Sequence, residues 1–157
     1  MARIYVASSW RNERQPEIVA ALRFAGHEVY DFRNPGDGET GFHWSEIDPN
    51  WQQWTPQQFR SALARSRLVD AGYTKDLNAM RWADACMLVL PSGRSAHLEA
   101  GWFVGQDKRA FVFLADGEPE LMYRMFSGHC CTIDEVLSAC STVASKGHDS
   151  AGPGPPQ

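Results

Sequence analysis

The sequence predicts an α/β protein: a flavodoxin-like or Rossmann-like three-layer sandwich around a mostly parallel five-stranded sheet. Strand-like segments alternate along the chain with segments of helical spacing, which is typical of parallel strands joined by helices. Two of the strand-like segments, Arg3–Ala7 and Cys86–Leu90, show no polar alternation, so both of their faces are expected to be buried. At 157 residues, the chain has the length of one domain.

The N-terminal elements follow the β-α-β order. The first strand is predicted over Arg3–Ala7, and Ser8–Asn12 forms the turn after it. Apolar residues at helical spacing predict a helix over Gln15–Ala25, which Gly26 ends in a left-handed conformation. The second strand is predicted over His27–Phe32.

The segment Arg33–Trp54 has neither a helical nor a strand period. A loop of this length in a compact domain is usually functional or disordered, and its three tryptophans, Trp44, Trp51 and Trp54, argue against disorder. Two interpretations follow: the tryptophans pack in a minor core, or Trp44 belongs to a lid that stacks on a bound base.

The rest of the chain continues the alternation to residue 145, and the Gly/Pro/Ser-rich residues 146–157 are expected to form a disordered tail. We therefore predict one domain over residues 1–145. The remaining predicted helices are Pro56–Ala64, Thr74–Ala83, Ser95–Val104, the short Pro119–Phe126 and Asp134–Ala144, and the remaining strands are Ala85–Leu90, Lys108–Leu114 and Cys130–Ile133.

Composition excludes several classes of function. A net charge of −4 and a pI of about 5.7 argue against a nucleic-acid polymer or a membrane surface as partner. An N-terminus that quickly becomes polar is no signal peptide, so a cytoplasmic location is expected. The spacing of the four cysteines fits neither a disulfide framework nor a zinc site, and we expect all four to be reduced core residues. No cofactor is expected, because neither a dinucleotide-binding glycine fingerprint nor a P-loop is present.

Glu99 is the leading candidate for chemistry. It follows an apolar strand and a Pro91–Arg94 turn, at the start of a predicted helix. In open α/β sheets, ligands bind where strands end and the next helices begin. The turn after the first strand should lie at the same crevice, which brings Ser8, Ser9 and Trp10 near the stretch Ser92–Glu99. A carboxylate there can act as a base, a ribose ligand or a covalent nucleophile.

Four segments together resemble the nucleoside 2-deoxyribosyltransferase family and the related nucleotide N-glycoside hydrolases. Each motif is weak by itself, but their order and spacing across residues 3 to 125 are similar to those of the family. The segments are Ile4–Ser8, Tyr73–Met80, Ala83–Val89, and Leu98–Trp102 followed by Lys108 and Arg109.

The resemblance implies a role for each matching residue. Glu99 matches the nucleophile that forms a covalent deoxyribosyl ester, Asp76 the acid that meets the leaving base, and Tyr5 a pocket tyrosine. The segment from Pro119 to Met122 resembles a stretch that a neighbouring subunit supplies to the 5′ end of the sugar, so a homodimer or higher homo-oligomer is expected. Two positions depart from the family pattern, since Gly93 replaces an Asp and Glu120 replaces an Asn.

The chemistry can also be argued from the residue types alone. Cleavage of an N-glycosidic bond passes through an oxocarbenium-like state, which a carboxylate below C1′ stabilises or traps. The leaving base needs a proton, which an acid at its edge supplies. Glu99 and Asp76 can divide these two tasks. The sequence leaves transfer and hydrolysis open, and it leaves three alternatives: a nucleoside 5′-monophosphate N-glycoside hydrolase, a non-catalytic nucleotide-binding module, and an NAD-cleaving enzyme.

Several of these residues also have a purely structural interpretation. Asp76 could be solvated, and Tyr5 could be a core residue. Asp84 is expected to be structural, His97 to lie at the helix surface, and Ser95 to cap the helix that follows it.

The 5′ end of the substrate is the last open point. Glu120 would repel a phosphate dianion and accept a hydrogen bond from a free 5′-hydroxyl. In favour of a nucleotide, the N-terminus of the helix predicted over Ser95–Val104 offers a cradle for a phosphate. The balance slightly favours a nucleoside. The candidate cradle residues are Ser92, Gly93, Arg94 and Ser95, with Ser8 and Ser9 adding donors.

Overall fold

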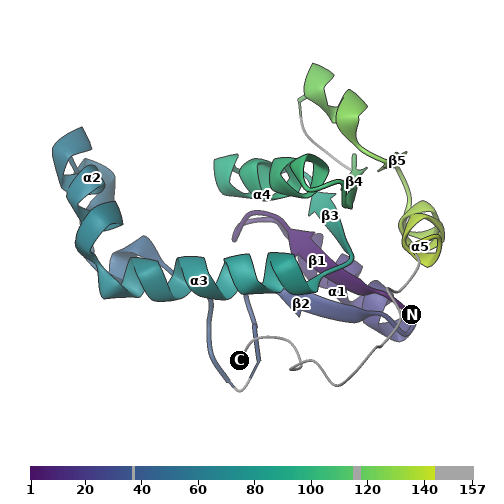
Figure 1. Cartoon of the computed structure of the whole chain (residues 1–157), viewed down its shortest axis with the longest axis horizontal. Coiled ribbons are helices and arrows are strands. Elements are labelled where there is room, and N and C mark those ends of the chain that lie inside the picture. Colours follow the sequence, from purple (N-terminus) through teal and green to yellow (C-terminus); the bar gives the residue numbers. More distant parts are fainter. Residues whose placement is uncertain (37, 115–117, 144–157) are drawn as a thin grey trace.

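The computed structural model describes residues 1–36, 38–114 and 118–143. Its centre is one sheet of five parallel strands in the order β2-β1-β3-β4-β5 (Figure 1), which confirms the predicted fold class. The order changes direction between β1 and β3, the position at which α/β sheets open a crevice for ligands. The strands are β1 (Arg3–Ala7), β2 (Glu28–Asp31), β3 (Ala85–Val89), β4 (Arg109–Phe113) and β5 (Gly128–Cys130).

Helices cover both faces of this sheet, because successive strand residues point to opposite sides. Ile4 and Val6 of β1 pack under α1 (Gln15–Phe24) and α5 (Ile133–Ser141). Tyr5 and Ala7 of the same strand face the other layer. That layer is formed by α3 (Arg67–Trp82) and α4 (Arg94–Gly105). The expected three-layer sandwich is therefore present, and the two cores are separate clusters of buried residues.

The helix α2 (Pro56–Arg65) projects beyond the sheet at the far end of α3 (Figure 1). Thr55 and Gln58 form a capping box at its start, and α2 has no buried residue. The next helix begins seven residues earlier than the predicted Thr74, at Arg67. Ser66 explains the difference, since its side chain accepts a hydrogen bond from the Val69 backbone N–H and so caps a new helix.

The C-terminal boundaries also differ from those predicted. The last strand ends at Cys130, whereas Cys130–Ile133 was expected, because Thr132 already caps α5 by accepting a hydrogen bond from the Glu135 backbone N–H. Cys131 consequently lies in the turn and is exposed, so the prediction that all four cysteines are core residues is wrong for this one. The predicted tail, residues 146–157, falls outside the described residues.

Short 3-10 helices replace two predicted features. The segment that precedes α2, predicted without regular structure, contains η1 (Trp44–Glu46) and η2 (Trp51–Gln53). The short helix predicted over Pro119–Phe126 is the 3-10 helix η3 (Leu121–Met125). Gly26 ends α1 as expected, with a φ of 85° in the left-handed region.

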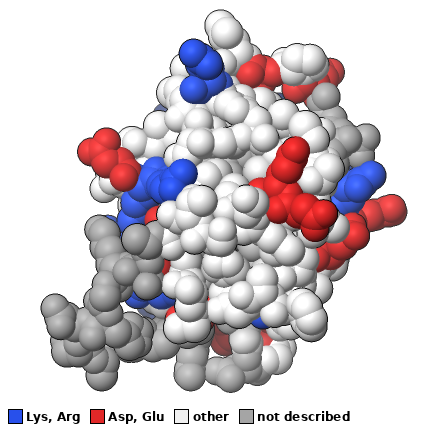
Figure 2. Space-filling view, turned by 90° about the vertical axis from the view of Figure 1, so that its right-hand side faces the viewer, with Lys and Arg blue, Asp and Glu red and all other residues white. Residues whose placement is uncertain are grey.

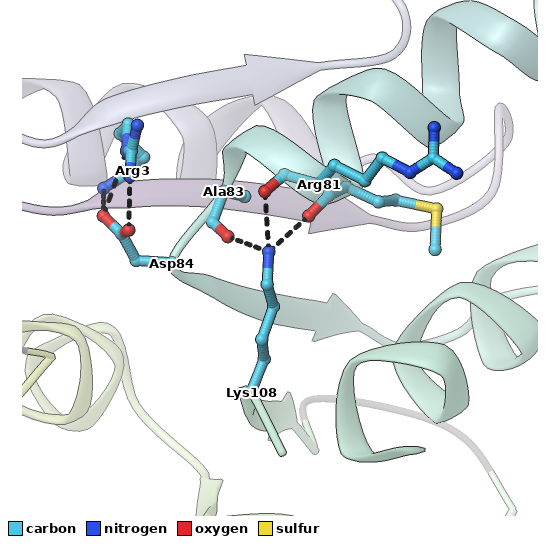
Figure 3. A network of polar contacts seen from close by, with 6 residues as sticks. Arg3, Arg81, Ala83, Asp84 and Lys108 are labelled. Atoms are coloured by element: carbon cyan, nitrogen blue, oxygen red, sulfur yellow. Dashed lines mark hydrogen bonds and ion pairs between the residues drawn. The ribbon is translucent and has the colours of Figure 1, made fainter. Parts of the chain in front are cut away.

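Lys108 holds the C-terminal end of α3 (Figure 3). Its ammonium group donates hydrogen bonds to the backbone oxygens of Met80, Arg81 and Ala83 at 2.9, 2.8 and 2.6 Å. These are carbonyl groups of the last helical turn, where the helix dipole favours a cation. Next to it, the Arg3 guanidinium pairs with Asp84 at 2.8 Å, so Asp84 has the structural role expected for it.

We predict that Lys108→Met lowers the free energy of unfolding by about 2 kcal/mol, because carbonyl groups at the helix end lose a charged donor. Urea denaturation would measure the change. Lys75→Met is the control, since the Lys75 ammonium group pairs with Glu39 near the surface and its loss is expected to cost less than about 1 kcal/mol. Equal losses in the two variants would contradict a special contribution from Lys108.

Candidate active site

Two tyrosines from neighbouring strands form the floor of the candidate site. Tyr5 of β1 lies opposite Tyr30 of β2 in the strand register, so both side chains point to the layer of α3 and α4. Their rings are stacked with centroids 5.2 Å apart, and both are almost fully buried. Each hydroxyl group meets a carboxyl group from one of the two helices above.

Glu99 extends from the second turn of α4. Its Oε1 accepts a hydrogen bond from the Ser95 hydroxyl at 2.8 Å, and the Tyr5 hydroxyl is a second partner. Burial raises the pKa of Glu99 to about 7; the Ser95 hydrogen bond lowers it, the nearby Asp76 carboxyl raises it, and the Tyr5 hydrogen bond lowers it. A carboxyl group that titrates near neutral pH at the end of a parallel sheet is a functional-site candidate on physical grounds.

Asp76 faces the same space from α3. Its Oδ1 accepts a hydrogen bond from the Tyr30 hydroxyl at 2.8 Å. Burial raises the pKa of Asp76, while the Tyr30 hydrogen bond and the Lys75 charge lower it. The structure therefore brings together the three residues that the sequence predicts for catalysis: Glu99, Asp76 and Tyr5.

Burial also raises the pKa of both tyrosines, and the neighbouring carboxyl groups raise it further. The hydroxyl groups thus stay protonated and remain hydrogen-bond donors over the physiological range. The Tyr5 hydroxyl is a hydrogen-bond partner of Glu99, and the Tyr30 hydroxyl donates to Asp76, so each carboxyl group has its own tyrosine on the sheet.

The turn after β1 and the turn after β3 are adjacent, as the topology predicts. The Ser8 hydroxyl donates to the Val89 backbone oxygen at 2.9 Å, and the Asn12 amide donates to Val89 and Pro91 oxygens at 3.0 and 3.1 Å. The Arg33 guanidinium also holds the first turn by donating to the backbone oxygens of Ser9 and Asn12. These bonds join the two turns at the carboxyl ends of β1 and β3.

The predicted cap of α4 is wrong. Gly93 is the residue at the N-cap, and no side chain caps the helix there. Ser95 lies inside the first turn and donates to Glu99, which removes it from a capping role. Arg94 is exposed at the start of the helix, and the Ser92 hydroxyl lies 3.4 Å from Nδ1 of His97.

His97 and Glu120 have partners within the chain. Nε2 of His97 lies 2.8 Å from the Tyr123 hydroxyl, and Nδ1 lies 2.8 Å from the Gly93 backbone oxygen. These contacts join α4 to η3. The Glu120 carboxylate accepts a hydrogen bond from the Met122 backbone N–H at 3.1 Å and caps η3.

The two tryptophans named as candidates lie in different surroundings. Trp10, partly exposed after β1, packs against Phe32 and against His43, with a centroid distance of 4.1 Å to the His43 ring. Trp44 belongs to an aromatic cluster with Phe42, Trp54 and Phe59 at centroid distances from 4.9 to 5.9 Å. This agrees with minor-core packing of Trp44, and a contact with a bound base stays a prediction.

Tyr30 is the site residue that sequence reasoning missed. Its position in the second predicted strand was a usable signal, because that strand follows a right-handed crossover and neighbours the first. The pairing register decides which side chain lies opposite Tyr5, and the sequence does not specify that register.

Among the described residues, no group of His, Cys, Asp or Glu side chains has an arrangement that could hold a metal ion. None of the described helices is long and apolar enough to cross a membrane.

Comparison with known proteins identifies the fold. No family model and no curated protein matches the sequence. Among solved structures, the chain is similar to a 2-deoxyribosyltransferase from the psychrotolerant bacterium Bacillus psychrosaccharolyticus, with 21% identity over 87% of this chain and 90% of that chain and a TM-score of 0.59. The fold is 2-deoxyribosyltransferase-like. Within this deoxyribosyltransferase-like fold, Glu99 and Asp76 lie on two helices of one layer.

The raised pKa of Glu99 predicts a pH-dependent stability. Because this pKa lies above its ordinary 4.5, the folded state binds the proton more tightly than the unfolded state. The resulting stability is complete below about pH 4.5 and is lost as the pH rises through about 7. Glu99→Gln avoids this loss, and we expect its gain over the wild type to be about 2 kcal/mol larger at about pH 8 than at about pH 5, allowing for partial exposure of the side chain.

Urea denaturation at the two pH values would measure this difference. Glu17→Gln on α1 is the matched control for the change from Glu to Gln, because Glu17 is exposed on the other face of the sheet. A gain for Glu99→Gln that does not depend on pH would contradict the prediction.

Proposed function

We propose that this protein cleaves the N-glycosidic bond of a nucleoside or nucleotide through a covalent glycosyl ester on Glu99. The observation that carries the proposal is the pair of carboxyl groups on α3 and α4, each hydrogen-bonded to its own tyrosine on the sheet. The reaction needs one carboxyl group below C1′ and another at the leaving base, and Glu99 and Asp76 can take these two roles. The deoxyribosyltransferase-like fold supports the same reaction class.

In the first step, the Glu99 carboxylate attacks C1′ as the bond from C1′ to the base nitrogen breaks. The electron pair of that bond goes to the base, which takes a proton from Asp76. In the second step, water or a second base attacks C1′, the ester bond breaks, and Asp76 accepts the proton of the attacking group. Water gives hydrolysis and a base gives transfer, from one intermediate.

The first step requires an ionised Glu99, whose pKa is about 7. The same step requires a protonated Asp76, whose pKa is raised by burial. The rate is therefore expected to pass through a maximum with pH, because Glu99 is protonated at acid pH and Asp76 is ionised at alkaline pH.

A direct test is intact-protein mass spectrometry after incubation with 2′-deoxynucleosides, their 5′-monophosphates and NAD. A deoxyribosyl adduct that maps to Glu99, together with release of free base, is the expected result. Comparison of each deoxynucleoside with its monophosphate, with and without an acceptor base, would define the substrate and separate transfer from hydrolysis. Reversible binding without an adduct or base release would contradict the proposal, and release of nicotinamide from NAD alone would redirect it to a different substrate.

The 5′ end of the sugar distinguishes a nucleoside from a nucleotide. We infer a slight preference for the nucleoside, because Glu120 would repel a phosphate. The exposed Arg94 beside the uncapped start of α4 favours the opposite choice. Glu120→Gln is expected to improve the use of the monophosphate relative to the nucleoside. A wild type that already prefers the monophosphate would make Arg94 the leading phosphate ligand.

We further infer a homo-oligomer, in which η3 of one subunit approaches the pocket of its neighbour. Leu121, Met122 and Met125 on η3 expose apolar surface, as does Leu98 on α4. The right-hand face of the molecule in Figure 1 carries dispersed charges on a largely uncharged surface (Figure 2), which also favours contact between copies. Sedimentation at micromolar concentration should give a dimer or larger species, and Met122→Glu should shift it toward monomer. A monomeric wild type would contradict the inference.

A further inference from the structure

The Tyr30 hydroxyl reaches Asp76 from a fixed point on the sheet. It donates to Oδ1 of Asp76 at 2.8 Å, and the Tyr30 ring is only 2% exposed. Stacking on Tyr5, with an interplanar angle of 18°, holds the ring in place from the neighbouring strand. Rotation of Tyr30 would therefore break the stack as well as the hydrogen bond.

Asp76 needs such a partner because its own carboxyl torsion is soft. The helix fixes its Cα, through the buried Ala79 and Met80 one turn later, but that packing does not orient the carboxyl group. The neighbouring Lys75 pairs with the Glu39 carboxylate. Tyr30 is thus the described hydrogen-bond donor that selects one of the two oxygens of Asp76.

We propose that Tyr30 is a positioning residue for the leaving base: by holding Oδ1 of Asp76, it leaves Oδ2 as the oxygen that carries the proton to the base. This inference rests on the proposed function. It adds a residue that acts through Asp76 and does not itself touch the reacting atoms.

Two effects of the Tyr30 hydroxyl have opposite signs, which makes the proposal testable. Its hydrogen bond stabilises the ionised carboxyl group and lowers the pKa of Asp76. Removal of the hydroxyl therefore favours the protonated acid, and an effect on protonation alone would maintain or increase the rate at neutral pH. Loss of positioning would instead decrease the rate although more of the acid is protonated.

The test is Tyr30→Phe, which removes the hydroxyl and keeps the stacked ring. We expect kcat for a 2′-deoxynucleoside with a neutral base to fall about 10- to 100-fold, while the pKa of Asp76 in the pH profile moves to a higher value. An N7-methylated purine deoxynucleoside is the second substrate, because its cationic base leaves without taking a proton. Its kcat should change less than about twofold, a pattern that a general loss of structure would not produce.

Tyr123→Phe is the matched control, since it also removes a hydroxyl group bonded to another side chain, here His97, from a buried ring. Unchanged kcat in Tyr30→Phe on the neutral substrate, or equal losses on both substrates, would overturn the inference. A wild type without activity would instead refute the proposed function. In that case, a carboxyl-selective NMR titration still measures the contact, because the pKa of Asp76 should rise in Tyr30→Phe and not in Tyr123→Phe.

Discussion

Glu99→Gln is expected to decrease the turnover of a 2′-deoxynucleoside by at least about 10³-fold, because an amide cannot form the glycosyl ester. The substitution keeps the size of the side chain and one acceptor for the Ser95 hydroxyl, so the fold should persist. Base release followed by chromatography would measure the rate, and circular dichroism would verify the fold.

Glu17→Gln serves as the control, because it removes an exposed carboxylate from α1 on the opposite face of the sheet. The control should retain the wild-type rate. If Glu99→Gln also turned over the substrate at a near-normal rate, Glu99 would have no place in the mechanism, even if the protein cleaved nucleosides.

The second large effect is expected for Asp76→Asn, with a loss of about 10²- to 10³-fold on substrates whose leaving base must be protonated. Asparagine still accepts the Tyr30 hydrogen bond through its amide oxygen, so the packing around α3 should be preserved. The N7-methylated purine deoxynucleoside should restore most of the rate, since its base leaves without a proton.

Asp70→Asn is the matched control on the same helix, because Asp70 is exposed in the first turn of α3. It should leave both substrates unaffected. A loss in Asp76→Asn that is equally large on the N7-methylated substrate would indicate binding or folding, and not proton transfer, as the role of Asp76.

Continuous apolar runs and the order of elements were sufficient to predict the architecture. The runs in Arg3–Ala7 and Cys86–Leu90 form the two central strands, and burial of both faces explains why polar residues do not interrupt them. The ends of the helices were less predictable, because a single capping side chain decides where a helix begins. The Ser66 hydroxyl starts α3 seven residues before Thr74, and nothing in the apolar spacing marks that event.

The candidate site was only partly predictable for a similar reason. Glu99, Asp76 and Tyr5 lie on segments with recognisable patterns, and the structure brings them together. Tyr30 could not be selected, since its relevance depends on strand register. The role of Ser95 was also missed, because α4 begins one residue before Ser95, which places its hydroxyl inside the helix and four residues before Glu99.

The two ends of α3 differ in how tightly they are packed against the rest of the protein. Lys108 and the buried Ala79 and Met80 hold the C-terminal end of the helix, and Lys75 pairs with Glu39 further back, whereas α2 at the other end has no buried residue. Asp76 lies about one turn from the buried Ala79 and Met80, where movement of the exposed end of α3 causes the smallest displacement. The overhanging part of the chain around Ser66 can therefore change in length, or be displaced by another macromolecule, with little displacement of the Asp76 carboxyl group.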